Sequence, residues 1–202
     1  MRTFLNIPNA ENKQLSEKFS FLLKCNDDCT ADDFGWVAIT VFDHWLYETG
    51  SVNVIEEASN AQKQVWDQTI ERFLRQLVDL EQPLKYRYVG RNSNQKLRFS
   101  RFVKDGNMGE YVSSLFNDVY WPNLVFNRLG LNLWFEDNWT IHLKYIKQED
   151  CLDMFKLASK LGLFVLPVYS ADHLDNYAAL SEYLSQQGLN QSLHRTVNLV
   201  AE

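Results

Sequence analysis

Residues 131–169 carry the clearest hydrophobic pattern in the chain. Apolar and polar residues alternate over 131–135 and again over 139–146, and this period of two predicts two strands. A loop of three residues, 136–138, would pair Leu133 with Ile141 and bring the apolar side chains of both strands to one face, with the last loop residue left-handed. We therefore predict a β-hairpin with one apolar face.

Apolar residues after this hairpin recur with the spacing of a helix. The repeat covers 148–161 and ends at Gly162, a residue type that is common at helix C-termini. The almost wholly apolar run 163–169 then predicts a short strand. A helical crossover between the two would let this strand join the same sheet as the hairpin.

Four further segments have a clear pattern. We interpret 59–80 and 172–187 as amphipathic helices and 84–89 and 97–103 as strands. Together the segments predict an α+β fold: an antiparallel or mixed sheet of about five strands with amphipathic helices packed on it, 148–161 among them. Because no repeat or linker divides the chain, we expect residues 1–202 to form a single globular domain.

Other segments are less decisive. Asp32 and Asp33 are good helix N-caps, and the apolar side chains from Phe34 to Leu46 recur at helical spacing, which predicts a buried helix that ends by Gly50. The run 37–42 within this segment is rich in β-branched residues and leaves a buried strand as the alternative. The weaker expectations are a helix from Asn12, a short helix near 111–119 and an edge strand near 193–200, with 124–129 left unassigned.

The composition limits the class of protein. Hydrophobic residues make up 46% of the chain, but no run approaches the ~20 apolar residues that span a bilayer. The first residues lack the uninterrupted apolar core of a signal peptide, so we expect a cytoplasmic protein without a membrane partner. Aromatic residues make up 14%, an unusually high share, which indicates either an aromatic-rich core or an exposed recognition surface.

The cysteines predict neither a disulfide framework nor a metal site. There are three of them, an odd number. Cys25 and Cys29 are close in sequence, but no Cys or His pair elsewhere supplies the two further ligands that zinc requires. For Cys151 we expect a buried thiol rather than a reactive one. No cofactor and no metal are predicted.

Charge is segregated along the chain far more sharply than the net charge of −6 suggests. Residues 25–62 contain eight acidic residues and no Lys or Arg, for a local charge of −8. The predicted hairpin 84–104 contains seven basic residues and no Asp or Glu, for a local charge of +7. The candidate binding residues are taken from these two segments: Lys85, Arg87, Arg91, Lys96, Arg98 and Arg101, and Asp27, Asp28, Asp32 and Asp33.

Three interpretations of this segregation are open. The two segments could neutralise each other within the molecule, as surface charges often do. One or both could be exposed for a partner protein, with charge setting the association rate and aromatics supplying affinity. The basic hairpin could instead bind nucleic acid or another polyanion, because its arginines alternate with aromatic residues as in single-strand binders. The chain is acidic overall, with a pI near 5.3, and this argues against binding of nucleic acid or another polyanion.

Catalytic motifs are missing from the sequence. We find no phosphate-binding glycine loop, no nucleophile elbow and no metalloprotease or calcium motif. His142 is the one candidate proton-transfer residue, on the second face of the predicted hairpin opposite Asn132. A structural histidine is the simpler interpretation.

The function predicted from the sequence is therefore non-enzymatic protein–protein binding, of the kind that neutralises a toxin or regulates an enzyme. Binding of nucleic acid or a polyanion through 84–104 is the first alternative. An enzyme with a site near His142 is the second.

Overall fold

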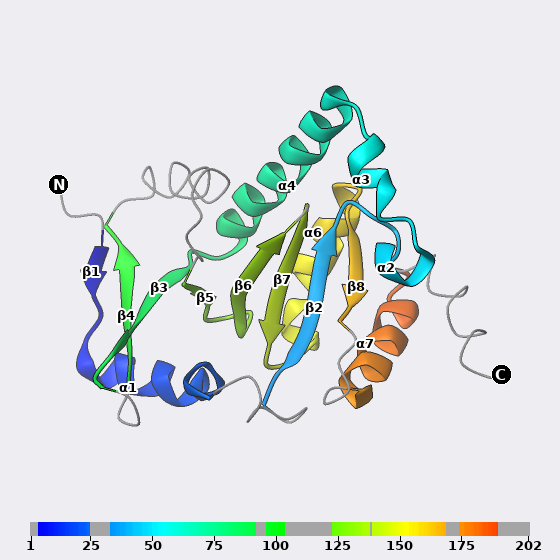
Figure 1. Cartoon of the computed structure of the whole chain (residues 1–202). Helices are drawn as coiled ribbons and strands as arrows, with labels where there is room; N and C mark the ends of the chain where they lie inside the picture. Colours follow the sequence, from blue (N-terminus) through cyan, green and yellow to red (C-terminus); the bar gives the residue numbers. More distant parts are fainter. Residues whose placement is uncertain are drawn as a thin grey trace.

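A computed structural model describes residues 4–24, 33–91, 96–103, 123–137, 139–168 and 174–189. Within these residues the chain forms a sheet of eight strands in the order β1-β4-β3-β5-β6-β7-β2-β8, and all neighbours are antiparallel (Figure 1). The strands are β1 Phe4–Asn6, β2 Gly35–Thr40, β3 Leu84–Val89, β4 Lys96–Phe102, β5 Leu124–Phe126, β6 Leu131–Asp137, β7 Thr140–Tyr145 and β8 Phe164–Pro167. The predicted α+β fold is confirmed, but the sheet has eight strands rather than about five.

The described helices lie on both faces of this sheet. They are α1 Asn9–Lys18, α2 Leu46–Thr49, α3 Asn53–Glu57, α4 Asn60–Leu80, α6 Leu152–Lys160 and α7 Leu174–Gln186. The predicted long helix corresponds to α4, and the Ser59 hydroxyl caps its N-terminus by accepting a hydrogen bond from the Gln62 N–H at 3.2 Å. No helix among the described residues is long and apolar enough to cross a membrane.

Three strands are additions to the predicted sheet. The helix expected over 33–46 is wrong, and the alternative of a buried strand is correct, since β2 occupies Gly35–Thr40. Val37, Ala38 and Ile39 are fully buried, so both faces of β2 are covered and no alternation marks it in the sequence. The strands β1 and β5 have three residues each, too few to show a pattern.

The predicted hairpin exists, but its register and loop were wrong. Leu133 pairs with Leu143, two residues further along β7 than predicted, and Asp137 pairs with Thr140. A bulge between Leu133 and Phe135 adds one residue to β6. The turn contains Trp139 with a φ of 59°, so a tight loop replaces the three-residue one. The predicted register is wrong because it requires unbroken alternation of the two faces, which the bulge interrupts.

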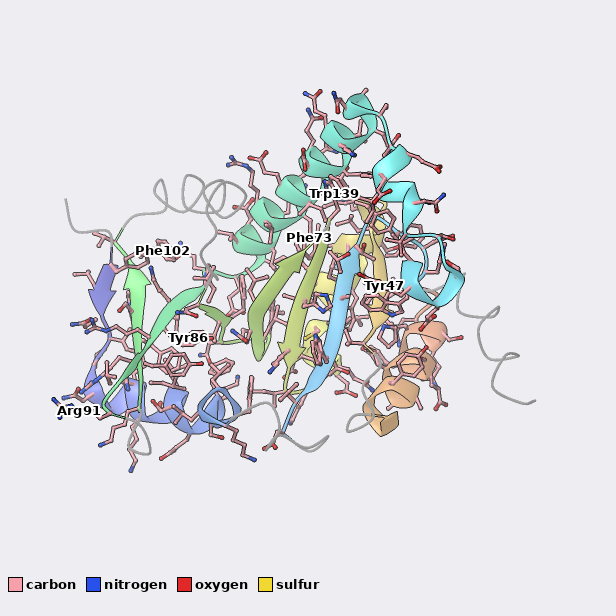
Figure 2. The ribbon with its side chains drawn as sticks, viewed as in Figure 1. Tyr47, Phe73, Tyr86, Arg91, Phe102 and Trp139 are labelled. Carbon is pink, nitrogen blue, oxygen red and sulfur yellow. The ribbon has the colours of Figure 1, made fainter. Side chains whose placement is uncertain are left out.

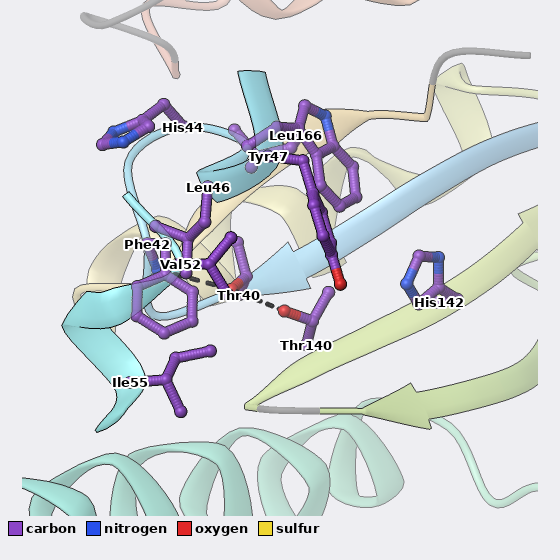
Figure 3. Close-up of a pocket in the computed structure, with 11 residues that line it drawn as sticks. Thr40, Phe42, His44, Leu46, Tyr47, Val52, Ile55, Thr140, His142 and Leu166 are labelled. Carbon is purple, nitrogen blue, oxygen red and sulfur yellow. Dashed lines mark hydrogen bonds between the residues drawn. The ribbon is translucent and has the colours of Figure 1, made fainter. Parts of the chain in front are cut away.

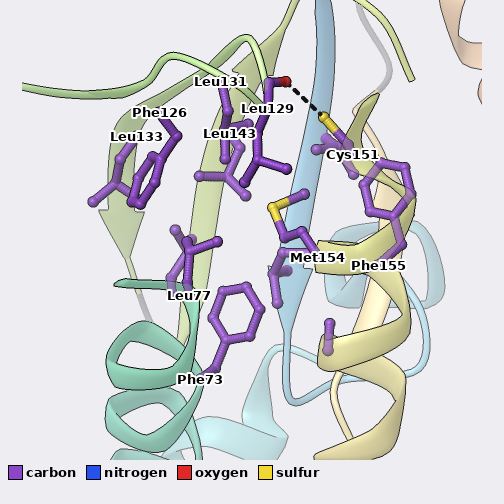
Figure 4. Close-up of a cluster of buried hydrophobic side chains, with 14 of the residues drawn as sticks. Phe73, Leu77, Phe126, Leu129, Leu131, Leu133, Leu143, Cys151, Met154 and Phe155 are labelled. Carbon is purple, nitrogen blue, oxygen red and sulfur yellow. Dashed lines mark hydrogen bonds between the residues drawn. The ribbon is translucent and has the colours of Figure 1, made fainter. Parts of the chain in front are cut away.

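One face of the sheet packs against α4, α6 and α7 and forms the larger core (Figure 4). Phe73 and Leu77 of α4 meet Met154 and Phe155 of α6 over the strands, and all four side chains are buried. Cys151 is also buried there, as expected, and its thiol donates to the Leu129 carbonyl oxygen at 3.5 Å. Burial raises the pKa of this thiol, which keeps it protonated.

The strand after the predicted crossover joins the same sheet, as expected. However, β8 pairs with β2 and not with the hairpin. Because β7 and β8 are both antiparallel to β2, they run parallel to each other with α6 as their connection. The strand β2 therefore lies between two strands that come more than a hundred residues later.

The opposite face of the sheet is covered by α1 and the turn after it, at the β4-β3-β5 end. Asn12 of α1 is buried there against the edge of β4. Its amide donates to the Leu97 carbonyl oxygen at 3.0 Å, and its Oδ1 accepts from the Phe99 N–H at 2.9 Å. Since β1 pairs with β4 only over 100–102, this side chain satisfies backbone groups that no strand reaches.

Candidate functional site

Two neighbouring cross-strand pairs in the hairpin of β3 and β4 lie on opposite faces of the sheet. Tyr86 pairs with Phe99, and the next pair along the strands is Arg87 with Arg98. Successive side chains of a strand point to opposite faces. Tyr86 and Phe99 lie in the core under α1, only 4% and 1% exposed, whereas Arg87 and Arg98 are exposed on the other face.

Three of the six predicted basic residues converge on that exposed face. Lys85, Arg87 and Arg98 line a shallow hollow of about 280 Å³ together with Phe4, Asn6 and Ser100, which come from the neighbouring strands β1 and β4, and with the buried Tyr86. We call the six residues other than Tyr86 the basic face. Figure 2 labels Tyr86, Arg91 and Phe102 at this end of the sheet.

The basic face holds its positive charges close together. Arg87 and Arg98 are directly opposite each other across β3 and β4, an arrangement that costs stability for like charges. Arg98 donates to the Asn9 side-chain oxygen at 3.0 Å, and the Lys85 ammonium lies 4.8 Å from the centre of the Phe4 ring. Neither arginine forms an ion pair with any carboxylate in the part of the chain that the structure describes.

The other predicted basic residues lie elsewhere. Arg101 faces α1 and donates to both carboxylate oxygens of Glu11 at 2.8 Å, so its charge is used within the molecule. Lys96 is exposed and shares the face of Arg98 by register, beyond the hollow. Arg91 is exposed after the end of β3.

The predicted acidic residues do not meet the basic face where both are described. Asp33 forms an ion pair with Lys24, while Asp27, Asp28 and Asp32 lie outside the described residues. The later acidic residues of the segment, Asp43, Glu48, Glu56 and Glu57, lie on or next to α2 and α3 at the opposite end of the sheet (Figure 1). No ion pair between described residues joins 33–57 to 84–103.

His142 lies on β7 at that opposite end, on the face away from α4. Its register differs from the prediction, because it pairs with Phe135 and Ala38 while Asn132 pairs with Lys144. Its ring is 5.9 Å from that of Trp36 and 6.0 Å from that of Trp45. Burial lowers the pKa of His142 to about 4, so the imidazole is neutral at pH 7.

The two tryptophans were missed as neighbours of His142 because residues 33–46 were interpreted as a helix. A helix would have placed Trp36 and Trp45 with no relation to β7. The pairing of β2 with β7 puts Trp36 beside Lys144, and the loop after β2 brings Trp45 over His142.

Searches of protein-family models, curated proteins and solved structures gave no match to this chain. The described residues also contain no group of three or more His, Cys, Asp or Glu side chains that could hold a metal ion. The basic face and the surroundings of His142 are therefore the two regions whose geometry bears on function.

Proposed function

We propose that this protein works by binding another protein, and that the basic face holds an acidic segment of that partner. The observation that carries the proposal is the exposed Arg87–Arg98 pair with Lys85 beside it. Like charges placed directly opposite each other reduce the stability of the free protein, and a carboxylate seated between them removes that cost. Arginine suits the role because its planar guanidinium can bind a carboxylate through two parallel hydrogen bonds.

A protein partner is favoured over nucleic acid by the positions of the aromatic residues. Single-strand binders stack bases on exposed rings beside their cations. In this hairpin Tyr86, Phe99 and Phe102 are buried, and the more exposed Tyr88 donates its hydroxyl to the Leu22 carbonyl oxygen at 3.0 Å. Phe4, the one ring in the basic face, is partly buried against Phe102 and has Lys85 over it. The net charge of −6 also repels a phosphate backbone everywhere outside the basic face.

A direct binding measurement tests the proposal. Fluorescent octaglutamate and a fluorescent ten-residue oligothymidylate would be titrated with the protein at low and high salt and followed by anisotropy. The test variant is Arg87→Glu with Arg98→Glu. The matched control is Arg72→Glu with Lys156→Glu, which makes the same change in net charge at exposed positions on α4 and α6.

We expect the peptide to bind the wild type and the control variant. The test variant should bind at least about tenfold more weakly, a loss of roughly 1.4 kcal/mol, because two charge-assisted contacts are reversed. Equal weakening in both variants would mean that only net charge matters, and would overturn the proposal. Tighter binding of the oligonucleotide, lost in the test variant alone, would assign the face to nucleic acid instead.

The natural partner can then be sought with the same variants. Extract of the native host would be passed at low salt over immobilised wild type, test variant and control variant. A protein retained by the wild type and the control but not by the test variant is the expected result. Its acidic segment should cross-link to residues next to the basic face, on β1 or β4.

A further inference from the structure

A second hollow lies on the face of the sheet away from α4, at the β7-β2-β8 end (Figure 3). Its floor is the sheet, through His142, Thr140, Thr40 and Leu166. Its roof is the segment 42–55, which includes α2 and the start of α3. The cavity volume is about 120 Å³.

Rings and aliphatic side chains form most of the wall. Trp45 stacks on His142 at 6.0 Å with 30° between the ring planes, and its indole N–H donates to the Pro167 carbonyl oxygen at 3.0 Å. The indole is therefore held in place before any ligand arrives. Tyr47 is 83% exposed, and Figure 3 shows its hydroxyl end pointing toward Thr140 and His142. Val52 and Ile55 complete the apolar rim.

Two threonine hydroxyls lie on the floor of the hollow. The Thr40 and Thr140 hydroxyls lie 2.9 Å apart and are buried, and Thr40 Oγ1 also accepts from the Phe42 N–H at 3.3 Å. The lining contains no Lys, Arg, Asp or Glu side chain. His44 lies at the rim, 2.5 Å from the Asp43 carboxylate.

We propose that this hollow binds a neutral molecule with a single six-membered aromatic ring and one or two polar substituents. Its ring would lie against Trp45 and Tyr47, and its polar edge would face Thr40, Thr140 and His142. A closed cavity of roughly 150 Å³ accepts benzene, and this hollow of about 120 Å³ is open beside the exposed Tyr47, so one ring can enter with part of its edge in solvent. A fused pair of rings would leave much more of its surface in water. A charged ligand would lose its hydration with no Lys, Arg, Asp or Glu side chain in the lining to replace it.

Phenol is the probe that matches this chemistry, and two relatives test its limits. Benzoate carries a charge on the same ring, and indole adds a second ring. Binding would be followed through the imidazole carbon-bound proton signals of His142 and His44 in NMR spectra. We expect phenol to shift the His142 signals in a saturable way and more than the His44 signals. Benzoate and indole should bind at least about tenfold more weakly, because each violates one feature of the hollow.

Val52, at the N-cap of α3, and Val54, in its first turn, provide a matched pair of variants. Val52 lines the hollow and is 38% exposed, whereas Val54 does not line it and is 40% exposed. Val52→Phe should fill the hollow and weaken phenol binding at least about tenfold, a change worth roughly 1.4 kcal/mol. Val54→Phe adds the same side chain two residues later and should leave binding unchanged.

Tyr47→Ala provides a test that does not depend on filling the hollow. This side chain is almost fully exposed, so its removal spares the core, and phenol binding should fall about two- to tenfold with the loss of one ring contact. Three results would each overturn the proposal. Phenol could fail to shift the His142 signals, Val52→Phe and Val54→Phe could bind phenol equally, or benzoate and phenol could bind equally. None of these results bears on the basic face, which lies at the other end of the sheet.

Discussion

The two ends of the sheet use their strands in opposite ways. At the β1-β4-β3 end, the buried face holds aromatic residues such as Tyr86 and Phe99, and the exposed face holds cations. At the β7-β2-β8 end, three helices cover one face, and the other face holds aromatic and neutral polar side chains around His142. One end therefore suits a charged partner and the other a neutral ligand, although the same alternation of side chains builds both.

The largest effects should come from the cores of the two ends. Phe73→Ala in the larger core and Phe99→Ala in the smaller one should each reduce the free energy of unfolding by about 3–5 kcal/mol, because each leaves a cavity. We expect a single transition in both variants. The reason is β5, whose Leu124 and Phe126 belong to the larger core and whose Val125 belongs to the smaller.

Urea unfolding measured by tryptophan fluorescence and by circular dichroism checks this expectation. Four of the six tryptophans, Trp36, Trp45, Trp66 and Trp139, are at or near the β7-β2-β8 end, so their part of the fluorescence reports on that end. Coincident curves in Phe99→Ala would show that the ends unfold together. A dichroism change that precedes the fluorescence change would instead separate the two ends.

The next largest effect is a dependence of stability on pH at the β7-β2-β8 end. Burial holds the pKa of folded His142 at about 4, below the ordinary value of 6.5, so the unfolded chain binds the proton more readily between these values. Stability should therefore fall as the pH is lowered from 6.5 toward 4, by roughly 1–3 kcal/mol. His142→Gln should remove this part of the decrease, whereas His44→Gln should keep it. Thermal unfolding at pH 7, 5.5 and 4.5 measures the difference, and identical slopes in the two variants would contradict the assignment.

The smallest effect concerns the basic face and has an unusual sign. Arg87→Glu should replace a like-charged cross-strand pair with an attractive one and raise the free energy of unfolding by about 0.2–1 kcal/mol. The same variant should bind octaglutamate more weakly.

Arg101→Ala should instead lower the free energy of unfolding by up to about 1 kcal/mol, because it removes the ion pair with Glu11, and should leave peptide binding unchanged. Chemical unfolding and anisotropy together measure both. A stabilising effect without loss of binding would show that the pair is not a binding element.

The sequence predicted those parts of the fold whose two sides differ in environment. The helix α4 has one buried and one exposed side, and β4 alternates buried Leu97 and Phe99 with exposed neighbours, so their periodicity is visible. β2 is covered on both faces and therefore resembled a helix. A side chain at Gly35 would overlap the ring of Tyr145, which explains the glycine in β2. This contact is visible only in the structure.

The candidate sites were predictable to a similar extent. The cluster of cations at 84–104 was visible, and the spacing of three residues between Arg98 and Arg101 places them on opposite faces of a strand. Which of them shares a face with Lys85 and Arg87 depends on the register between β3 and β4, which the sequence does not show. His142 was singled out without Trp36 or Trp45. Their contacts with it require pairing between segments a hundred residues apart, and local periodicity contains no information about such pairing.

The position of β2 has a consequence for folding during synthesis on the ribosome. Thr40 and the residue that it touches across the sheet, Thr140, are 100 positions apart, and the strand on the other side of β2 is later still (Figure 1). A ribosome releases the chain from its N-terminus, so β2 emerges long before either neighbour has been made. During that interval the strands that bury Val37 and Ile39 do not yet exist, so both side chains stay exposed to water. We expect a chaperone that binds nascent chains to bind this segment.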